Sequence, residues 1–116
     1  MTDRELVLAA ARILSDKKGE GIVLIDLSDV SIPTSFFLVV DADNPVHAKA
    51  LVSALREGLP EKPLRSEGLE ERKWVVLDYG DVVVHVFERQ TRKFYDIESL
   101  WADHMVSLED IAVPSR

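Results

Sequence analysis

The stretch Lys73 to Phe87 constrains the fold more than any other part of the chain. It reads Lys-Trp-Val-Val-Leu-Asp-Tyr-Gly-Asp-Val-Val-Val-His-Val-Phe, which is two apolar, β-branched runs around a short polar segment. Branched side chains suit a packed, pleated sheet, and Gly80 between aspartates suits a tight reversal, so the stretch predicts a β-hairpin. The apolar runs hardly alternate with polar residues, which indicates that both faces of the sheet are covered. Because a two-stranded ribbon alone is marginal in water, other elements must pack on it.

Helices are expected before and after this hairpin. Thr2 and Glu5 have the spacing of a capping box, and the residues after them form one apolar stripe at helical spacing. Asn44 and Pro45 combine an N-cap residue with proline at the first helical position, which predicts a second helix. A last helix is expected around Asp96, which is a favourable N-cap residue.

Strands are expected over 22–27, 36–40 and 64–66, in addition to the hairpin. The order of elements predicts an α/β (α+β) fold, with a single domain and a mixed sheet flanked by helices. We place this domain at residues 1–105 and expect residues 106–116 to form a loosely held C-terminal tail, because that segment carries few structural signals.

Composition excludes several classes of protein. The chain has 116 residues, of which 47% are hydrophobic and 30% charged, as in an ordinary globular domain. No apolar run approaches the roughly 20 residues that span a bilayer, and the polar N-terminus does not resemble a targeting peptide, so we expect a cytoplasmic protein. The absence of cysteine excludes disulfides, thiol catalysis and thiolate metal sites.

The net charge predicts the chemistry of a partner. The chain carries 21 acidic and 14 basic residues, for a formal charge of −7. RNA would repel such a chain unless its basic residues were clustered, so we expect little direct nucleic-acid binding. A basic protein surface is the better match, because complementary charge raises the rate of encounter.

Two segments together resemble a known family. Residues 74–87 are similar to the phrase Trp-Val-Leu-Leu-Asp-Tyr-Gly-Asp followed by Val-His-Val-Phe, and residues 92–101 read Arg-Lys-Phe-Tyr-Asp-Ile-Glu-Ser-Leu-Trp. This pairing is typical of the Iojap-related ribosomal silencing factor family (RsfS). The family's Ala-Asp-Tyr-Phe-Val-Ile strand is replaced by Thr-Ser-Phe-Phe-Leu-Val at residues 34–39.

The resemblance implies a fold, a partner and a mechanism. The implied fold is nucleotidyltransferase-like, with about five strands. The implied partner is the large ribosomal subunit, contacted through ribosomal protein L-fourteen where the small subunit docks. Occupying that face would block subunit joining and repress translation without catalysis, and the family is also associated with large-subunit biogenesis.

Aromatic, acidic and arginine side chains on or beside the hairpin are the candidate partner-binding residues, because such side chains dominate interface energies. They are Trp74, Asp78, Tyr79, Asp81, Arg92, Tyr95, Asp96 and Trp101. Among the aromatic side chains, we expect Trp74 and Tyr79 to be partly exposed, and Trp101 and Phe94 to belong to the core. Self-association of the hairpin face into a homodimer is compatible with this hypothesis.

An enzyme is the alternative from another class. Asp26, Asp41 and Asp43 lie at expected strand ends and are the candidate magnesium ligands of a metal-dependent nucleotidyltransferase-like enzyme. Turn and cap roles explain these aspartates more simply, so we expect no catalytic residue, cofactor or metal. The three histidines have no zinc-site spacing, and His85 is expected to be a hydrogen-bonded, buried or half-buried residue of the sheet.

Overall fold

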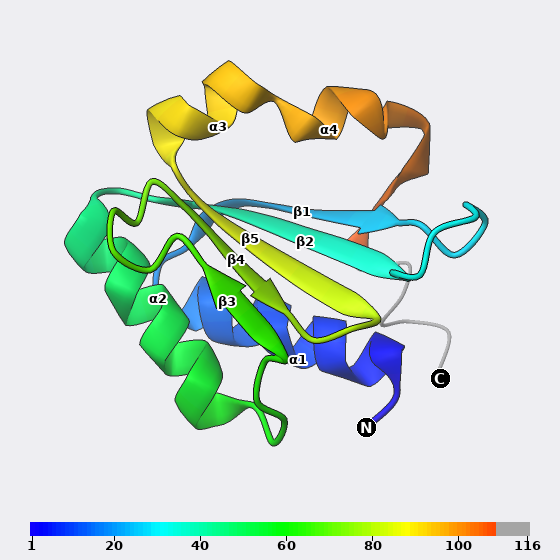
Figure 1. Ribbon diagram of the computed structural model, residues 1–116, viewed down its shortest axis with the longest axis horizontal. Coiled ribbons are helices and arrows are strands. Elements are labelled where there is room, and N and C mark those ends of the chain that lie inside the picture. The colour runs from blue at the N-terminus through cyan, green and yellow to red at the C-terminus, as the bar shows by residue number, and fades with distance from the viewer. Residues whose placement is uncertain (109–116) are drawn as a thin grey trace.

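A six-stranded sheet separates two layers of helix in the computed structural model, which describes residues 1–108 (Figure 1). The strand order is β3-β4-β5-β2-β1-β6. In chain order the elements are α1 (Asp3–Asp16), β1 (Glu20–Asp26), β2 (Phe36–Ala42), α2 (Pro45–Gly58), β3 (Arg65–Glu67), β4 (Trp74–Asp78), β5 (Val82–Glu88), α3 (Arg89–Tyr95), α4 (Ile97–Leu100), a 3-10 turn (Ala102–His104) and β6 (Met105–Val106).

The predicted hairpin is confirmed as β4 and β5, which pair antiparallel from Trp74 opposite Phe87 to Asp78 opposite Val83. Its turn is closed by a hydrogen bond from the backbone amide of Gly80 to Asp78 Oδ1, at 2.8 Å. Gly80 has φ of +92°, a conformation that side chains with a Cβ rarely adopt.

The hairpin lies in the middle of the sheet because β5 also pairs in parallel with β2. Every side chain of β5 from Val82 to Phe87 is buried. This pattern confirms that both faces of the hairpin are covered, as the unbroken apolar runs predict.

Helices α1 and α2 cover one face of the sheet (Figure 1). The predicted capping box is present, since the Thr2 amide donates to Glu5 Oε1 at 2.8 Å and the Glu5 amide to Thr2 Oγ1 at 3.1 Å. Asn44 caps α2 as predicted, and Pro45 is its first residue. Within residues 1–108, no helix is long and apolar enough to cross a membrane.

The other face is covered by two short helices, α3 and α4, where the sequence predicts one helix around Asp96 (Figure 1). Asp96 separates them in the left-handed conformation, with φ of +44°. It precedes α4 as an N-cap would, but its carboxylate accepts a hydrogen bond from Ser99 Oγ and makes no cap bond to a backbone amide.

The sheet has one strand more than expected. Met105 and Val106 form β6, which pairs antiparallel with Ile25 and Leu24 of β1. Val106 and Leu108 are also partly buried against the core. The boundary that the sequence suggests after residue 105 therefore falls inside β6, and residues 109–116 of the expected tail lie outside the described part of the chain.

Candidate functional site

A row of aromatic rings connects the middle of the sheet with the molecular surface beneath α3. The ring of Trp74 stacks on Phe87, with centroids 4.8 Å apart and planes 25° apart. The ring of Tyr95, on α3, also packs against Trp74, with 4.8 Å between the ring centroids. Trp74 is half-buried, as expected, and links a core ring to an exposed one.

A hydrogen bond to His85 fixes the orientation of Trp74. The indole Nε1 of Trp74 donates to His85 Nδ1 at 3.1 Å, so Nδ1 carries no hydrogen and the proton of the neutral imidazole is on Nε2. Burial lowers the pKa of His85 to about 4, which keeps the ring neutral at physiological pH. Phe37 covers the imidazole, at 4.7 Å between centroids. His85 is therefore the buried, hydrogen-bonded residue that the sequence predicts.

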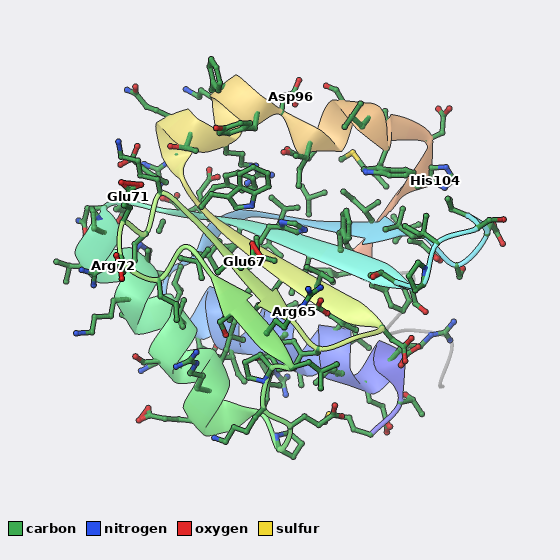
Figure 2. The ribbon with its side chains drawn as sticks, viewed as in Figure 1. Arg65, Glu67, Glu71, Arg72, Asp96 and His104 are labelled. Carbon is green, nitrogen blue, oxygen red and sulfur yellow. The ribbon has the colours of Figure 1, made fainter. Side chains whose placement is uncertain are left out.

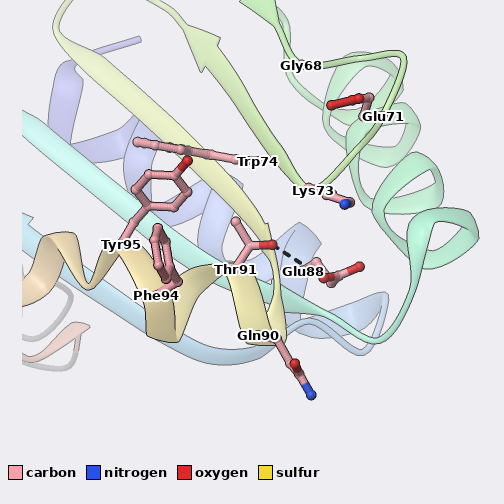
Figure 3. Close-up of a pocket in the computed structure, with 9 residues that line it drawn as sticks. All are labelled: Gly68, Glu71, Lys73, Trp74, Glu88, Gln90, Thr91, Phe94 and Tyr95. Carbon is pink, nitrogen blue, oxygen red and sulfur yellow. Dashed lines mark hydrogen bonds between the residues drawn. The ribbon is translucent and has the colours of Figure 1, made fainter.

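The outer end of this row lines a groove of about 460 Å³, which we call the aromatic groove (Figure 3). It lies between α3 and the segment that joins β3 to β4. Its lining residues are Gly68, Glu71, Lys73, Trp74, Glu88, Gln90, Thr91, Phe94 and Tyr95. Aromatic surface and two carboxylates thus share one hollow of the molecule.

Phe94 is 80% exposed, which contradicts the expectation that it belongs to the core. Adjacent positions on a helix point about 100° apart, so only one of Phe94 and Tyr95 can reach the sheet. Tyr95 takes that position against Trp74, while Phe94 contacts Tyr95 edge to face at 5.0 Å. Phe94, Glu71 and Glu88 are absent from the sequence-based candidates. The sequence held a signal for Phe94, because it directly precedes the candidate Tyr95.

Arg92 serves an internal contact in the structure. Its side chain is 11% exposed and lies between two carboxylates, with Nη1 2.8 Å from Asp41 Oδ1 and Nη2 2.9 Å from Glu98 Oε2. Asp41 belongs to β2 and Glu98 to α4, so the guanidinium joins the helical layer to the sheet. Gly21 makes room for it, because a Cβ there would lie 2.8 Å from Nη1.

The hairpin tip lies away from the aromatic groove. Asp78 and Trp74 are at opposite ends of β4, about 13 Å apart at the usual rise per residue. Asp78 pairs with Arg65 at 3.1 Å, and the carboxylate of Asp81 is exposed. The charge of Asp3 raises the pKa of Asp81.

Tyr79 is 7% exposed, so the expectation of partial exposure is wrong. Its ring belongs to the core cluster between the sheet and α1 and α2. Burial raises the pKa of the phenol, and the hydroxyl has no hydrogen-bond partner among the described residues.

Two further candidates belong to the helical layer. Trp101 is half-buried and its ring meets Phe37 at a right angle, with 6.5 Å between centroids. It packs on the margin of a second core cluster, which consists of Ile25, Leu27, Val39 and Phe87. The side chain of Asp96 is exposed. Of the eight sequence-based candidates, Trp74 of β4 and Tyr95 of α3 line the aromatic groove, three more belong to the helical layer beside it, and Asp78, Tyr79 and Asp81 lie at the hairpin tip.

The carboxylates of the enzyme alternative do not converge. Asp26 lies opposite Phe36, whereas Asp41 is five residues further along β2, which separates the two by about 17 Å. Asp41 and Asp43 instead bind arginines, including a 2.7 Å contact from Arg89 to Asp43. Over residues 1–108, no group of three or more His, Asp or Glu side chains is placed to hold a metal ion.

Comparison with known proteins shows which family the chain resembles. The family model described as "Ribosomal silencing factor during starvation" matches residues 1–116. A ribosomal silencing factor of Halalkalibacterium halodurans is 35% identical over 106 residues, which cover 89% of this chain and 91% of the relative. That of Chromobacterium violaceum is 36% identical and covers 87% of this chain and 85% of the relative.

Solved structures agree as well. A crystal structure of a protein from Chromobacterium violaceum superposes with a TM-score of 0.83 at 35% identity, covering 88% of each chain. The match thus extends over most of the chain rather than over one motif. The chain belongs to the ribosomal silencing factor family (RsfS).

Proposed function

We propose that the chain represses translation by binding ribosomal protein L-fourteen of the large subunit and sterically blocking the small subunit. Family membership is the observation that carries this proposal, because it supports a ribosome-associated silencing role. We further propose that the aromatic groove is the contact. No bond is made or broken in such a mechanism, so the divergent carboxylates are consistent with it.

The aromatic groove suits a lysine or arginine side chain of a basic partner. A cation is attracted to the faces of aromatic rings, and Trp74, Phe94 and Tyr95 offer such rings side by side (Figure 3). Glu71 and Glu88 line the same hollow and can accept charge-assisted hydrogen bonds. The net charge of −7 favours encounter with a basic ribosomal protein over long range.

Five of the eight sequence-based candidates take two kinds of role in this proposal, whereas Asp78, Tyr79 and Asp81 lie away from the groove and take none. Trp74 and Tyr95 line the groove, Asp96 follows Tyr95, and these three would contact the partner directly. Arg92 and Trp101 would hold the helical layer that carries them. A role in large-subunit biogenesis is compatible with the same contact, and the cytoplasm is the compartment we propose.

Subunit joining is the experiment that tests the proposal. Purified protein is mixed with large subunits, small subunits are added, and particle formation is followed by sedimentation. We expect the natural protein to keep the subunits apart and Phe94→Ala to bind about thirtyfold more weakly, as truncation of an interface anchor does. Tyr79→Ala is unsuitable, because it would open a cavity in the core.

Val46→Ala is the matched control, since Val46 is 77% exposed, does not line the aromatic groove, and lies on α2, on the other face of the sheet from α3. It should bind as the natural protein does. A natural protein that never sediments with large subunits would refute the silencing role. Equal binding by Phe94→Ala and Val46→Ala would refute the aromatic groove as the contact.

A further inference from the structure

Basic side chains gather in a second groove, of about 480 Å³, between α2 and the segment that joins β3 to β4. We call it the cationic groove. It is lined by Lys49, Val52, Ser53, Arg56, Leu69, Glu70 and Arg72. Arg72 lies beside α2, and Figure 2 shows it next to the preceding residue Glu71.

The cations of this groove have no carboxylate partner. Throughout residues 1–108, Lys49, Arg56 and Arg72 take part in none of the ion pairs. The Nε atoms of both arginines are buried without an acceptor, although Arg56 donates through Nη2 to Ser66 Oγ at 3.1 Å. The fold therefore leaves the positive charge of both guanidinium groups without a carboxylate, and an anion in this groove would supply the missing counter-charge.

A neighbouring hollow of about 430 Å³ extends the positive surface along β3. It shares Arg56 with the cationic groove and adds Lys62 and Arg65. The two hollows together gather five cations, whereas Glu70 is the carboxylate among their lining residues. In a chain of net charge −7, this is the local clustering of basic residues that binding to RNA requires.

We propose that the cationic groove binds backbone phosphates of RNA. Guanidinium groups match phosphate geometry, since each offers a planar fork of donors. None of the residues lining either hollow is aromatic, so a base would find no ring on which to stack, which disfavours a free nucleotide. An extended row of cations instead suits successive phosphates, read without regard to sequence. This contact goes beyond the proposed function, which concerns a protein partner.

Binding of a labelled single-stranded RNA of mixed sequence, followed by fluorescence anisotropy at several salt concentrations, tests the proposal. We expect binding at low salt, with a slope of log K against log salt of about −1.5 to −3, as two to four phosphate contacts on a single strand give. Arg56→Gln should weaken binding about fivefold and reduce the slope by about one. Arg12→Gln removes the same charge from an exposed site on α1 and should leave both unchanged.

Separate arms distinguish the source of the anion. Pyrophosphate that binds while RNA does not would overturn the proposal in favour of a small anion. Polyglutamate that competes as well as RNA would overturn it in favour of an acidic protein. Equal weakening by Arg56→Gln and Arg12→Gln would show non-specific attraction and also overturn it. No ribosome is present, and Phe94→Ala should bind RNA normally, so this test is independent of the silencing assay.

Discussion

His85 is the residue on which the aromatic row depends. It accepts the indole proton of Trp74 and is enclosed by Phe37 and Phe87. The sequence predicted its buried, hydrogen-bonded state from its alternation with Val83 and Phe87 on one side of a strand. It could not predict the partner, because the register of the hairpin, which sets Trp74 opposite Phe87 and so diagonal to His85, is not visible in the sequence.

Protonation of His85 should destabilise the fold in acid. The folded-state pKa is about 4, below the value of 6.5 for the unfolded chain. As the pH falls below 6.5, the unfolded state gains a proton that the native state refuses, so the free energy of unfolding falls. Between pH 7.5 and pH 4.5 we expect this residue to account for about 2 to 3 kcal/mol of lost stability.

Urea denaturation at the two pH values measures this loss. His85→Gln keeps an acceptor for Trp74 and removes the titrating ring, so its stability should fall by correspondingly less. His104→Gln keeps His85 and should behave as the natural protein. An equal loss in His85→Gln and the natural protein would contradict this account.

Tyr79 supplies a second prediction at the scale of a residue. Its hydroxyl is buried without a partner, so Tyr79→Phe removes a group whose desolvation is uncompensated. We expect the variant to be more stable by about 1 kcal/mol in urea denaturation. A loss of stability would mean that the hydroxyl is hydrogen-bonded in solution.

The environments of Tyr79 and Phe94 were both mispredicted, for different physical reasons. Tyr79 continues the alternation of Val75 and Leu77, and all three face α1 and α2. The two-residue period of the strand therefore predicts that Tyr79 is buried, although it lies one residue beyond the end of β4. Phe94 offered no such pattern, because α3 has only seven residues. A short helix gives too few turns to define a buried stripe.

At the scale of elements, α3 and α4 depend on Arg92. Its carboxylate partners are Asp41 and Glu98, and Asp41 is 51 residues away in sequence. No local pattern reveals such a contact. The hairpin and the helix starts were predictable because neighbouring residues determine them, whereas β6 was missed because two residues become a strand only beside β1.

Removing Arg92 should loosen the helical layer. Arg92→Ala leaves Asp41 and Glu98 partly buried without this cation, and we expect a loss of about 3 kcal/mol. Trp74 lies under this layer and Trp101 belongs to it, and both are partly buried, so their fluorescence should shift toward that of exposed indole. Lys93→Ala, at the adjacent exposed position, is the control. Equal stability of the two variants would show that α3 and α4 are held by apolar packing alone.

At the scale of the whole molecule, the fold class was predictable and the surface was not. Composition, hairpin and helix signals sufficed for a mixed sheet between helices, which the structure confirms. The net charge of −7 favoured a basic partner, but a net charge says nothing of distribution. Folding brings Lys49, Arg56 and Arg72 into one groove, although they are spread over 24 residues of sequence.

The homodimer that the sequence suggested is a prediction at this scale. The ring of Phe94 is exposed in the single chain, and a dimer that covers the aromatic groove would bury it. Burial of this apolar ring favours association in the absence of ribosomes. We expect sedimentation equilibrium to detect a weak dimer that Phe94→Ala dissociates and Val46→Ala does not. A natural protein that stays monomeric at high concentration would contradict self-association.

The two grooves share the segment between β3 and β4, and its side chains alternate between them. Glu71 and Lys73 line the aromatic groove, while Glu70 and Arg72 line the cationic groove. A hydrogen bond from the Arg72 amide to the Gly68 carbonyl, at 2.9 Å, closes this segment, and a Cβ on Gly68 would lie 2.0 Å from the Trp74 carbonyl oxygen. If both proposals hold, this segment keeps the two grooves at a fixed distance from each other. The protein then binds most tightly where a protein surface and an RNA strand lie side by side at that distance, because only there do the two binding energies combine.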